Sequence, residues 1–335
     1  MDHGLSARGR EAAKPDDGML LWTIVQDLWD PRLIQQATLS EHIHNHLAVP
    51  NHSFTYGDGM TGSKRLKETL SRFLTERLKP TAVIEPQHIS VTNGCSSAIE
   101  HLAWALGNPG DGFLLGQPHY GSFLPDVEYR TGYRLVQVPF HDVDPFGLDA
   151  VQTYEDSLLA AQKKGTRIAA IILCHPHNPL GRCYPRETII ELMRLCQRYN
   201  MHLISDEIYA LSTWNNTIDT HPKPVPYESC LSIDMTGIME PHRLHVLWGI
   251  DYAQGANAAF FLWVNLGKAY RERHPQREIQ DLSAEVMHAL LARKVFLASG
   301  NQFGSEQPGW FRIVFSNKTE LLLEGLERIT AVINN

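Results

Sequence analysis

The sequence predicts an α/β fold with a mostly parallel sheet, followed by a smaller α+β unit near the carboxyl terminus. From about residue 88, short apolar runs alternate with amphipathic helical patterns, which is typical of βαβ units. The run RIAAIILC at 167–174 is uninterrupted and rich in β-formers, as in a strand buried on both faces of a parallel sheet. We divide the chain into an amino-terminal arm with helices (1–50), a large α/β domain (51–250) and a small α+β domain (251–335).

The individual elements follow from local periodicity. Apolar residues at helical spacing predict helices within 19–48, and Leu66, Leu70 and Phe73 mark an amphipathic helix after a glycine-rich turn. Two further helices are expected at 96–107 and 185–200, beside the strands of the sheet. The predicted strands cover 88–94, 112–116, 133–140, 167–174, 201–207 and 243–250 in the large domain, and 259–266 and 309–316 in the tail. We expect the large sheet to be incomplete, with one strand fewer than a full sheet of this kind.

Composition excludes several classes of protein. The 335 residues carry a formal net charge of −7, which argues against a chain that binds the phosphate backbone of nucleic acid. No apolar run is long enough to cross a bilayer, and the first eighteen residues lack the apolar stretch of a secretory signal. The cysteines are scattered without paired spacing, which favours reduced thiols and a cytoplasmic protein. They are Cys95, Cys174, Cys183, Cys196 and Cys230.

Polar side chains follow the predicted strands, where open α/β sheets bind their ligands. After the first strand, the turn of Gly94, Cys95 and Ser96 opens a helix, and the free N–H groups of such a turn can bind an anion. Taken alone, these residues are more often explained by an ordinary helix cap by Ser96 or Ser97. After the second strand, Tyr120 stands beside a glycine, where it can stack on a flat ring or lie half-buried at a rim.

Two later strands end in residues that suit a nitrogen-containing ligand. Asn178 lies between two prolines and a glycine, so it is either a fixed hydrogen-bond donor or part of an ordinary turn. Asp206 and Glu207 end the buried strand 201–207, where a carboxylate is costly unless it has a partner. A helix cap would satisfy Asp206 structurally, and a cationic ligand nitrogen would use it functionally. Tyr209 completes an Asp-x-x-Tyr pair.

The order and spacing of these motifs resemble those of a known family. GQPHYGSF, HPHNPLGR and SDEIYALS, with VTNGCSSAIEHL before them and PGWFRIVFS after them, are similar to stretches of the fold-type-I, pyridoxal-phosphate-dependent class I/II aminotransferases. The branch most similar is that of 1-aminocyclopropane-1-carboxylate synthase and its fungal relatives. The resemblance implies that pyridoxal 5'-phosphate is the cofactor. It also implies that Gly94, Cys95 and Ser96 hold its phosphate and that Tyr120 stacks on its pyridine ring.

The same resemblance implies roles for the remaining candidates. Asp206 faces the pyridine nitrogen and keeps it protonated, so that the ring can accept electrons from the substrate's α-carbon. Asn178 and Tyr209 hydrogen-bond the ring hydroxyl, and Arg312 binds the α-carboxylate of an amino-acid substrate, a bidentate task that suits a guanidinium. Tyr56 matches a tyrosine that reaches the cofactor phosphate of a neighbouring subunit, which implies a homodimer.

One residue of the family pattern is missing. The family's lysine, which forms the internal Schiff base with the cofactor, lies in a turn after the strand that reads RLHVLWGI here, but this chain continues DYAQGAN. We align that continuation with a later segment of the family. On this alignment the chain lacks the lysine, a phosphate-binding arginine and one antiparallel strand, so we assign no catalytic lysine and expect a poorly soluble or catalytically feeble chain. Lys268 is the nearest substitute in sequence, and we interpret it as an exposed helix start. The lysines are Lys14, Lys64, Lys67, Lys79, Lys163, Lys164, Lys223, Lys268, Lys294 and Lys318.

These observations leave alternative functions open. The first is an aminotransferase or lyase acting on an amino acid, by transamination or by elimination at a sulfur-bearing substrate, as in secondary-metabolite biosynthesis. The second is a non-catalytic protein that binds the cofactor, or a partner subunit for an intact relative. A metal site at His42 and His46, which are four residues apart on one helix face, lacks a third ligand, so we assign no metal.

Overall fold

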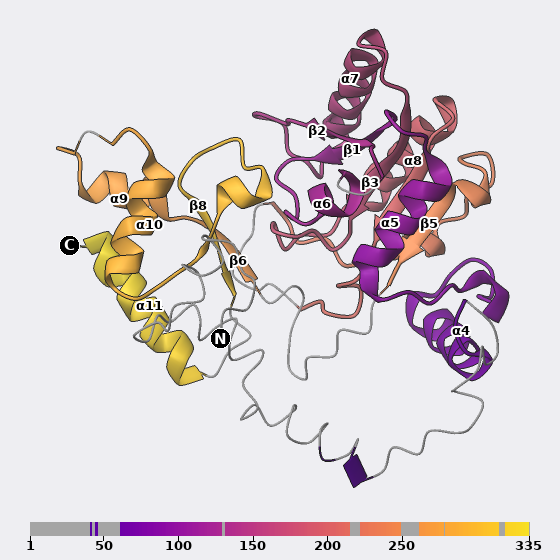
Figure 1. Cartoon of the computed structure of the whole chain (residues 1–335), viewed down its shortest axis with the longest axis horizontal. Coiled ribbons are helices and arrows are strands. Elements are labelled where there is room, and N and C mark those ends of the chain that lie inside the picture. Colours follow the sequence, from indigo (N-terminus) through magenta and orange to yellow (C-terminus); the bar gives the residue numbers. More distant parts are fainter. Residues whose placement is uncertain are drawn as a thin grey trace, which may run out of the picture. The chain divides into compact units, whose positions relative to one another are not determined.

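The structure is a computed structural model that describes residues 41, 44–45, 61–128, 131–214, 222–248, 261–277, 279–314 and 319–334 (Figure 1). The described residues fall into two compact units. The larger contains residues of Val49–Val264 together with Ser299–Ser316, and the smaller contains Asn265–Ala298 and Asn317–Asn335. The sequence assigns 299–316 to the small domain, whereas this division places them in the larger unit. The domain boundaries 1–50, 51–250 and 251–335 stay a prediction.

A five-stranded parallel sheet forms the centre of the larger unit. Its strand order is β2-β1-β3-β4-β5, and every neighbouring pair is parallel. The register pairs Ile172 with Ile204 and Cys174 with Asp206, so β3 and β4 end side by side. This confirms the predicted α/β fold with a mostly parallel sheet. The strands are β1 (Gly112–Gly116), β2 (Arg134–Val138), β3 (Ile168–Cys174), β4 (His202–Asp206) and β5 (Leu244–Leu247).

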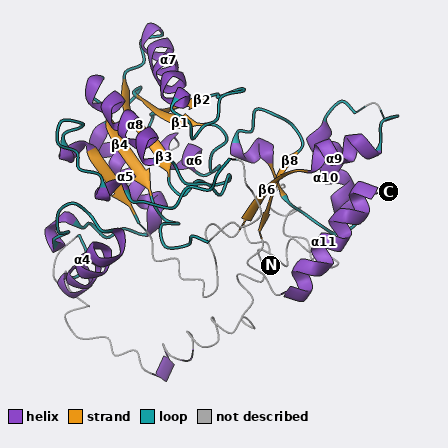
Figure 2. Ribbon diagram, turned by 180° about the vertical axis from the view of Figure 1, so that it is seen from behind, coloured by secondary structure: helices purple, strands orange, loops and turns teal. Residues whose placement is uncertain are grey.

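Helices cover both faces of this sheet (Figure 2). On one face, Ile171 and Leu173 of β3 pack with residues of α7 (Asp149–Lys163) and α8 (Arg186–Arg198). On the other face, Ala170 and Ile172 pack with residues of α5 (Gly94–Leu106) and α6 (Phe123–Glu128). Successive side chains of a strand point to opposite faces, so β3 must be apolar throughout, and all seven of its residues are buried.

The predicted first strand at 88–94 is wrong. A short 3₁₀ helix, η2 (Pro86–His88), covers its start, and α5 begins at Gly94. Between them the backbone is not part of a sheet, although Val91 N–H donates to the Thr61 carbonyl at 2.9 Å. A β-rich sequence becomes a strand only beside a partner strand, and no described strand pairs with residues 89–93. Ile89 instead packs in an apolar cluster with Leu74 and Leu78 of α4 (Lys64–Leu78) and with Trp248.

The remaining elements belong to the tail and the connections. A three-stranded sheet has the order β6-β8-β7, with β6 (Phe261–Asn265) and β8 (Trp310–Val314) lying within the two strands predicted for the tail. The third strand of this sheet is β7 (Ala298–Ser299). The remaining described helices are α9 (Leu266–Arg273), α10 (Leu282–Ala292), α11 (Thr319–Asn334) and the 3₁₀ helices η3 (Cys230–Ser232), η4 (Pro241–Arg243) and η5 (Gly300–Phe303). Apart from three residues, the helices predicted within 19–48 lie outside the described residues. Among the helices that are described, none has the length and apolar character needed to span a membrane.

Candidate functional site

The carboxyl ends of β3 and β4 bring three of the predicted site residues together. His175 N–H, one residue beyond β3, donates to the Asp206 carbonyl at 2.8 Å and continues the strand pairing. The turn after β3 then carries Asn178, and the turn after β4 carries Tyr209. The Asn178 Nδ2 donates to the Tyr209 hydroxyl at 3.3 Å. Strand pairing therefore places an amide, a phenol and a carboxyl group at one edge of the sheet, as the sequence predicts.

Arg312 of β8 joins this group from a distant part of the chain. Its Nη1 donates to the Asn178 Oδ1 at 3.3 Å, so Asn178 lies between Arg312 and Tyr209. The guanidinium lies over the Phe303 ring, with Cζ 4.8 Å from the centroid. Burial lowers the pKa of Arg312, and Tyr209 and Tyr120 oppose this shift. The two tyrosines therefore lie near Arg312, and Tyr120 is 37% exposed at the rim, with its ring edge-on to Phe123.

Asp206 is a buried acid with few partners of its own. Among the described residues its carboxylate accepts one hydrogen bond, from Ile208 N–H at 3.3 Å, and the side chain is almost inaccessible to solvent. Its pKa is raised to about 7, chiefly by desolvation and to a smaller extent by the charges of Glu207 and Asp126, while the hydrogen bond from Ile208 opposes the shift. No lysine or arginine of the residues described in the structure forms an ion pair with it. Such a carboxyl group suits a ligand that brings its own cation, such as a protonated ring nitrogen.

The turn that carries Asn178 is fixed by a residue that sequence reasoning missed. The Arg182 guanidinium binds Asp144 with two parallel hydrogen bonds of 2.8 and 3.0 Å, and its Cζ lies 4.1 Å from the centroid of the Phe146 ring. The turn itself closes when His177 N–H donates to the Arg182 carbonyl at 2.8 Å. Nothing in the sequence links Arg182 to Asp144, because the pairing depends on how two loops meet.

Glu207, which the sequence marks as an acid in need of a partner but to which we assigned no role, lies directly after β4 and is fully buried. Its Oε1 accepts hydrogen bonds from Ser205 Oγ at 3.1 Å and Cys230 N–H at 2.9 Å. Its Oε2 accepts from Ser229 Oγ at 2.6 Å and from the Tyr227 hydroxyl. The side chains of Ser205 and Glu207 meet on one face of the strand, so alternation directs Asp206 to the other. The four donors satisfy the buried carboxylate. Three of them belong to residues 227–230, so these hydrogen bonds attach that segment to the end of β4.

The predicted anion seat lies at the start of α5. Gly94 has a φ of +76°, and no atom of the described residues lies within 4 Å of a Cβ built on it. The Asn93 side chain makes no capping hydrogen bond to the helix. Ser96 Oγ, however, donates to Asp126 Oδ2 at 3.0 Å. Cys95 packs against the apolar cluster that contains Cys174. Among the described residues there is thus room for an anion beside Gly94, but the Ser96 hydroxyl group already donates to an acidic side chain.

Several predictions fall on residues that the structure does not describe. Tyr56 lies outside the described residues, as do His42 and His46 of the proposed metal pair. Within the described part of the chain, no three histidine, cysteine or acidic residues form a group that could hold a metal ion. Of the lysines that are described, none hydrogen-bonds to Asp206, Asn178 or Tyr209.

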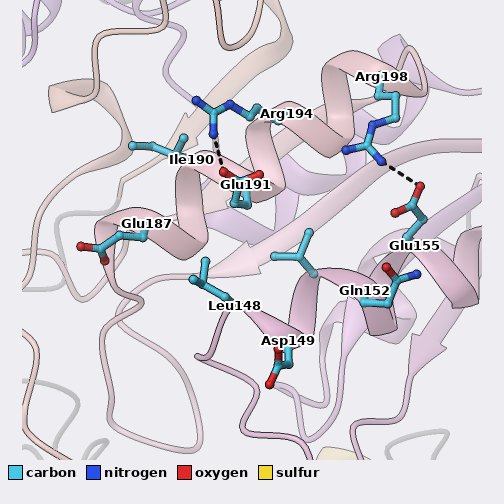
Figure 3. A pocket seen from close by; sticks show the side chains of 10 residues that line it. Leu148, Asp149, Gln152, Glu155, Glu187, Ile190, Glu191, Arg194 and Arg198 are labelled. Carbon is cyan, nitrogen blue, oxygen red and sulfur yellow. Dashed lines mark hydrogen bonds and ion pairs between the residues drawn. The ribbon is translucent and has the colours of Figure 1, made fainter.

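A groove between α7 and α8 is separate from this site (Figure 3). It has a volume of about 600 Å³, and its lining combines apolar side chains such as Leu148 and Ile190 with charged ones. The figure shows two ion pairs at its rim, Arg194 with Glu191 and Arg198 with Glu155. The groove contains none of the predicted site residues. Its lining consists of Leu148, Asp149, Val151, Gln152, Glu155, Glu187, Ile190, Glu191, Arg194 and Arg198.

The chain is similar in sequence and in fold to known proteins. The chain is 26% identical over 398 aligned residues to the probable aminotransferase GliI of Aspergillus fumigatus, covering 93% of this chain and 87% of that protein. It is 33% identical over 196 residues to the probable inactive 1-aminocyclopropane-1-carboxylate synthase-like protein 2 of Homo sapiens, covering 56% of this chain but only 32% of that protein.

Among solved structures, the fold matches kynurenine aminotransferase of Pyrococcus horikoshii with a TM-score of 0.65 at 16% identity, covering 90% of this chain and 87% of that one. At this identity the match shows the fold alone, and that fold is the one called fold type I. The model of the family named aminotransferase class I and II matches residues 35–231, which is more than half of the chain. These residues include the turns that carry Asn178, Asp206 and Tyr209. The chain therefore belongs to the class I and II aminotransferases.

Proposed function

We propose that this chain binds pyridoxal phosphate at the carboxyl ends of β3 and β4, and an amino acid beside it through Arg312. Pyridoxal phosphate is the cofactor of this family. The observation that carries the proposal is the hydrogen-bonded series of Tyr209, Asn178 and Arg312 next to the buried Asp206. In this proposal the ring nitrogen, the ring hydroxyl group and the amino-acid carboxylate each have a partner, and these partners come from the end of β3, the end of β4 and from β8.

Each residue has a definite task in this proposal. Asp206 holds a proton on the ring nitrogen, because an ionised carboxylate in a buried site is stabilised by an adjacent cation. Asn178 and Tyr209 orient the ring through its hydroxyl group, and Tyr120 stacks on one side of the ring. Arg312 binds the α-carboxylate of the amino acid. When bound, pyridoxal phosphate supplies an electron sink for chemistry at the amino acid's α-carbon.

We further propose that the reaction is transamination or elimination at a sulfur-bearing amino acid, and that this chain performs it feebly. Similarity to a fungal relative named a probable aminotransferase supports the first choice, and a role in secondary-metabolite biosynthesis stays a prediction. The expected impairment rests on the sequence, in which no lysine follows the strand 243–250 in a glycine- or serine-bearing turn. Lys163 and Lys164 lie at the end of α7, just before β3, and hence at the opposite end of the sheet from Asp206.

A second candidate is a non-catalytic member of the family that binds the cofactor or supports an intact subunit. The missing lysine favours it, and one human relative of this chain is itself named a probable inactive protein. A homodimer, with Tyr56 reaching the partner's site, and a cytoplasmic location remain proposals from the family resemblance.

Absorbance titration with pyridoxal phosphate tests the shared part of both candidates. We expect saturable binding by the unchanged chain and at least about tenfold weaker binding by Asp206→Asn, since the amide cannot balance a ring cation. A matched control is Asp156→Asn, because Asp156 is exposed on α7, where its carboxylate accepts a hydrogen bond from Gln152. Equal affinity of the Asp206→Asn variant and the unchanged chain would refute the assignment.

Borohydride treatment followed by mass spectrometry then separates the two candidates. A cofactor adduct that survives reduction on a lysine would show that another lysine serves, and would favour the enzyme. Binding without any such adduct would favour the non-catalytic protein. Rapid transaminase turnover by the purified chain would refute the proposed impairment.

A further inference from the structure

Glu306 attaches the segment that precedes Arg312 to the end of β2. Its Oε1 accepts hydrogen bonds from the backbone N–H groups of Phe140 at 2.7 Å and His141 at 3.2 Å, and its Oε2 accepts from His141 N–H at 3.0 Å. The Nδ1 atom of the His141 ring lies 2.9 Å from Oε2. Glu306 and His141 are 165 positions apart, so the fold alone brings them together.

The backbone at the end of β2 is shaped to receive this carboxylate. His141 has a φ of +49°, in the left-handed region that a residue with a side chain adopts at a cost. Successive N–H groups that point to one anion form an anion-binding concavity, and Glu306 fills the one made by Phe140 and His141. Its side chain is only 23% exposed. Hydrogen bonds to a carboxylate are charge-assisted, so this attachment is stronger than one between neutral groups.

Two further hydrogen bonds hold the same segment beside the loop that follows β1. His119 N–H donates to the Phe303 carbonyl at 2.6 Å, and Gln117 Nε2 donates to the Gly304 carbonyl at 2.9 Å. Residues 303–306 are therefore attached to the ends of two neighbouring strands of the large sheet, and Glu306 supplies the attachment to β2.

This segment supports the guanidinium of Arg312 directly. The Phe303 ring lies next to it, with the Arg312 Cζ 4.8 Å from the ring centroid. Phe311 and Ile313 are buried on one face of β8, so alternation directs Arg312 to the other face, where it reaches Asn178. A long side chain binds a ligand more tightly when its base and its stacking partner are already in place, because less conformational entropy is lost on binding.

We propose that Glu306 is a positioning residue, which holds residues 303–312 so that the Arg312 guanidinium meets the α-carboxylate of the bound amino acid. The inference rests on the proposed function, because it concerns the same arginine. It goes beyond that function in assigning the placement of Arg312 to a carboxylate that acts through the backbone of β2. Displacement of a binding group by about 1 Å is enough to weaken the interactions that depend on its geometry.

Binding of two compounds to the chain loaded with pyridoxal phosphate tests the inference without any need for turnover. The compounds are methionine and 3-(methylthio)propylamine, which is methionine without the carboxylate that Arg312 would bind. Glu306→Ala should weaken methionine binding about tenfold and leave the dissociation constants of the amine and of pyridoxal phosphate unchanged. The control Glu191→Ala, which removes a partly exposed ion pair on α8, should bind both compounds as the unchanged chain does.

A second variant keeps the test valid if Glu306→Ala destabilises the whole chain. Glu306→Gln has the same shape, and its amide oxygen still accepts a backbone N–H, so we expect only about threefold weaker methionine binding. Hydrogen exchange of the cofactor-free chain gives an independent measurement. It should become faster at residues 303–312 in Glu306→Ala and stay the same in β3.

The possible results separate this inference from the proposed function. If the unchanged chain prefers methionine to the amine and both Glu306 variants keep the same preference, the inference is overturned and the role of Arg312 stands. Equal weakening of methionine and amine binding would also overturn it, because the effect would then not pass through the carboxylate site. If the unchanged chain binds the two compounds equally well, the role proposed for Arg312 fails, and this inference fails with it.

Discussion

Replacing Glu207 by alanine removes the acceptor for four hydrogen bonds beneath the site. The side chain is fully buried and lies directly after β4. Its donors are Ser205 Oγ, the Tyr227 hydroxyl, Ser229 Oγ and the backbone N–H of Cys230. Alanine would leave these donors facing a cavity, and the segment around Cys230 would lose its attachment to the sheet.

The size of the effect follows from which donors can find other partners. The three hydroxyl groups can rotate or reach water, so each loses about 1 kcal/mol, whereas the Cys230 N–H is fixed and its burial unpaired costs about 1 to 3 kcal/mol. We therefore expect Glu207→Ala to lower the free energy of unfolding by about 4 to 6 kcal/mol. Glu207→Gln keeps the shape, and its amide can face the Tyr227 and Ser229 hydroxyls, so about 2 kcal/mol should be lost.

Urea unfolding followed by tryptophan fluorescence measures these differences. The control is Glu191→Ala, because Glu191 lies on α8 in a partly exposed ion pair with Arg194 and should change stability by less than about 0.5 kcal/mol. A loss below about 1 kcal/mol for Glu207→Ala would contradict the reasoning. It would mean that the Tyr227–Cys230 segment is held by other contacts, such as the His175 Nε2 hydrogen bond to the Glu228 carbonyl.

Three further predictions concern the site itself. Because burial raises the Asp206 pKa from 3.8 to about 7, the folded cofactor-free chain binds a proton that the unfolded chain releases, so its stability should fall between about pH 4 and 7 by up to about 4 kcal/mol. Urea unfolding at pH 5 and pH 8 should show this slope, and the slope should be flattened in Asp206→Asn. Arg312→Lys should weaken amino-acid binding about tenfold, because lysine loses the bidentate geometry; titration of the cofactor-loaded chain by absorbance tests this. Arg182→Leu should cost about 1 kcal/mol and speed hydrogen exchange around Asn178, since Arg182 anchors that turn to Asp144; equal exchange in the variant would refute it.

Much of the fold was predictable because its determinants are local. An apolar run such as 167–174 has few alternatives to a buried strand, and the strands β1 to β5 all lie within predicted ranges. The failure at 88–94 has the opposite cause. That segment has a suitable sequence, but a strand also needs a neighbour, and no described strand pairs with it. Pairing is a property of the assembled sheet, so local pattern could not decide it.

The candidate site divides in the same way. The sequence by itself determined which residues are available at the strand ends, including Asn178, Asp206 and Tyr209. The local pattern is sufficient for this, because it shows where an apolar strand stops and which turn residues follow. Only the tertiary structure decided that Arg312 reaches Asn178 and that Ser96 faces Asp126. These contacts join segments far apart in the chain, and their geometry is set by how strands pair and helices pack, which no local pattern contains.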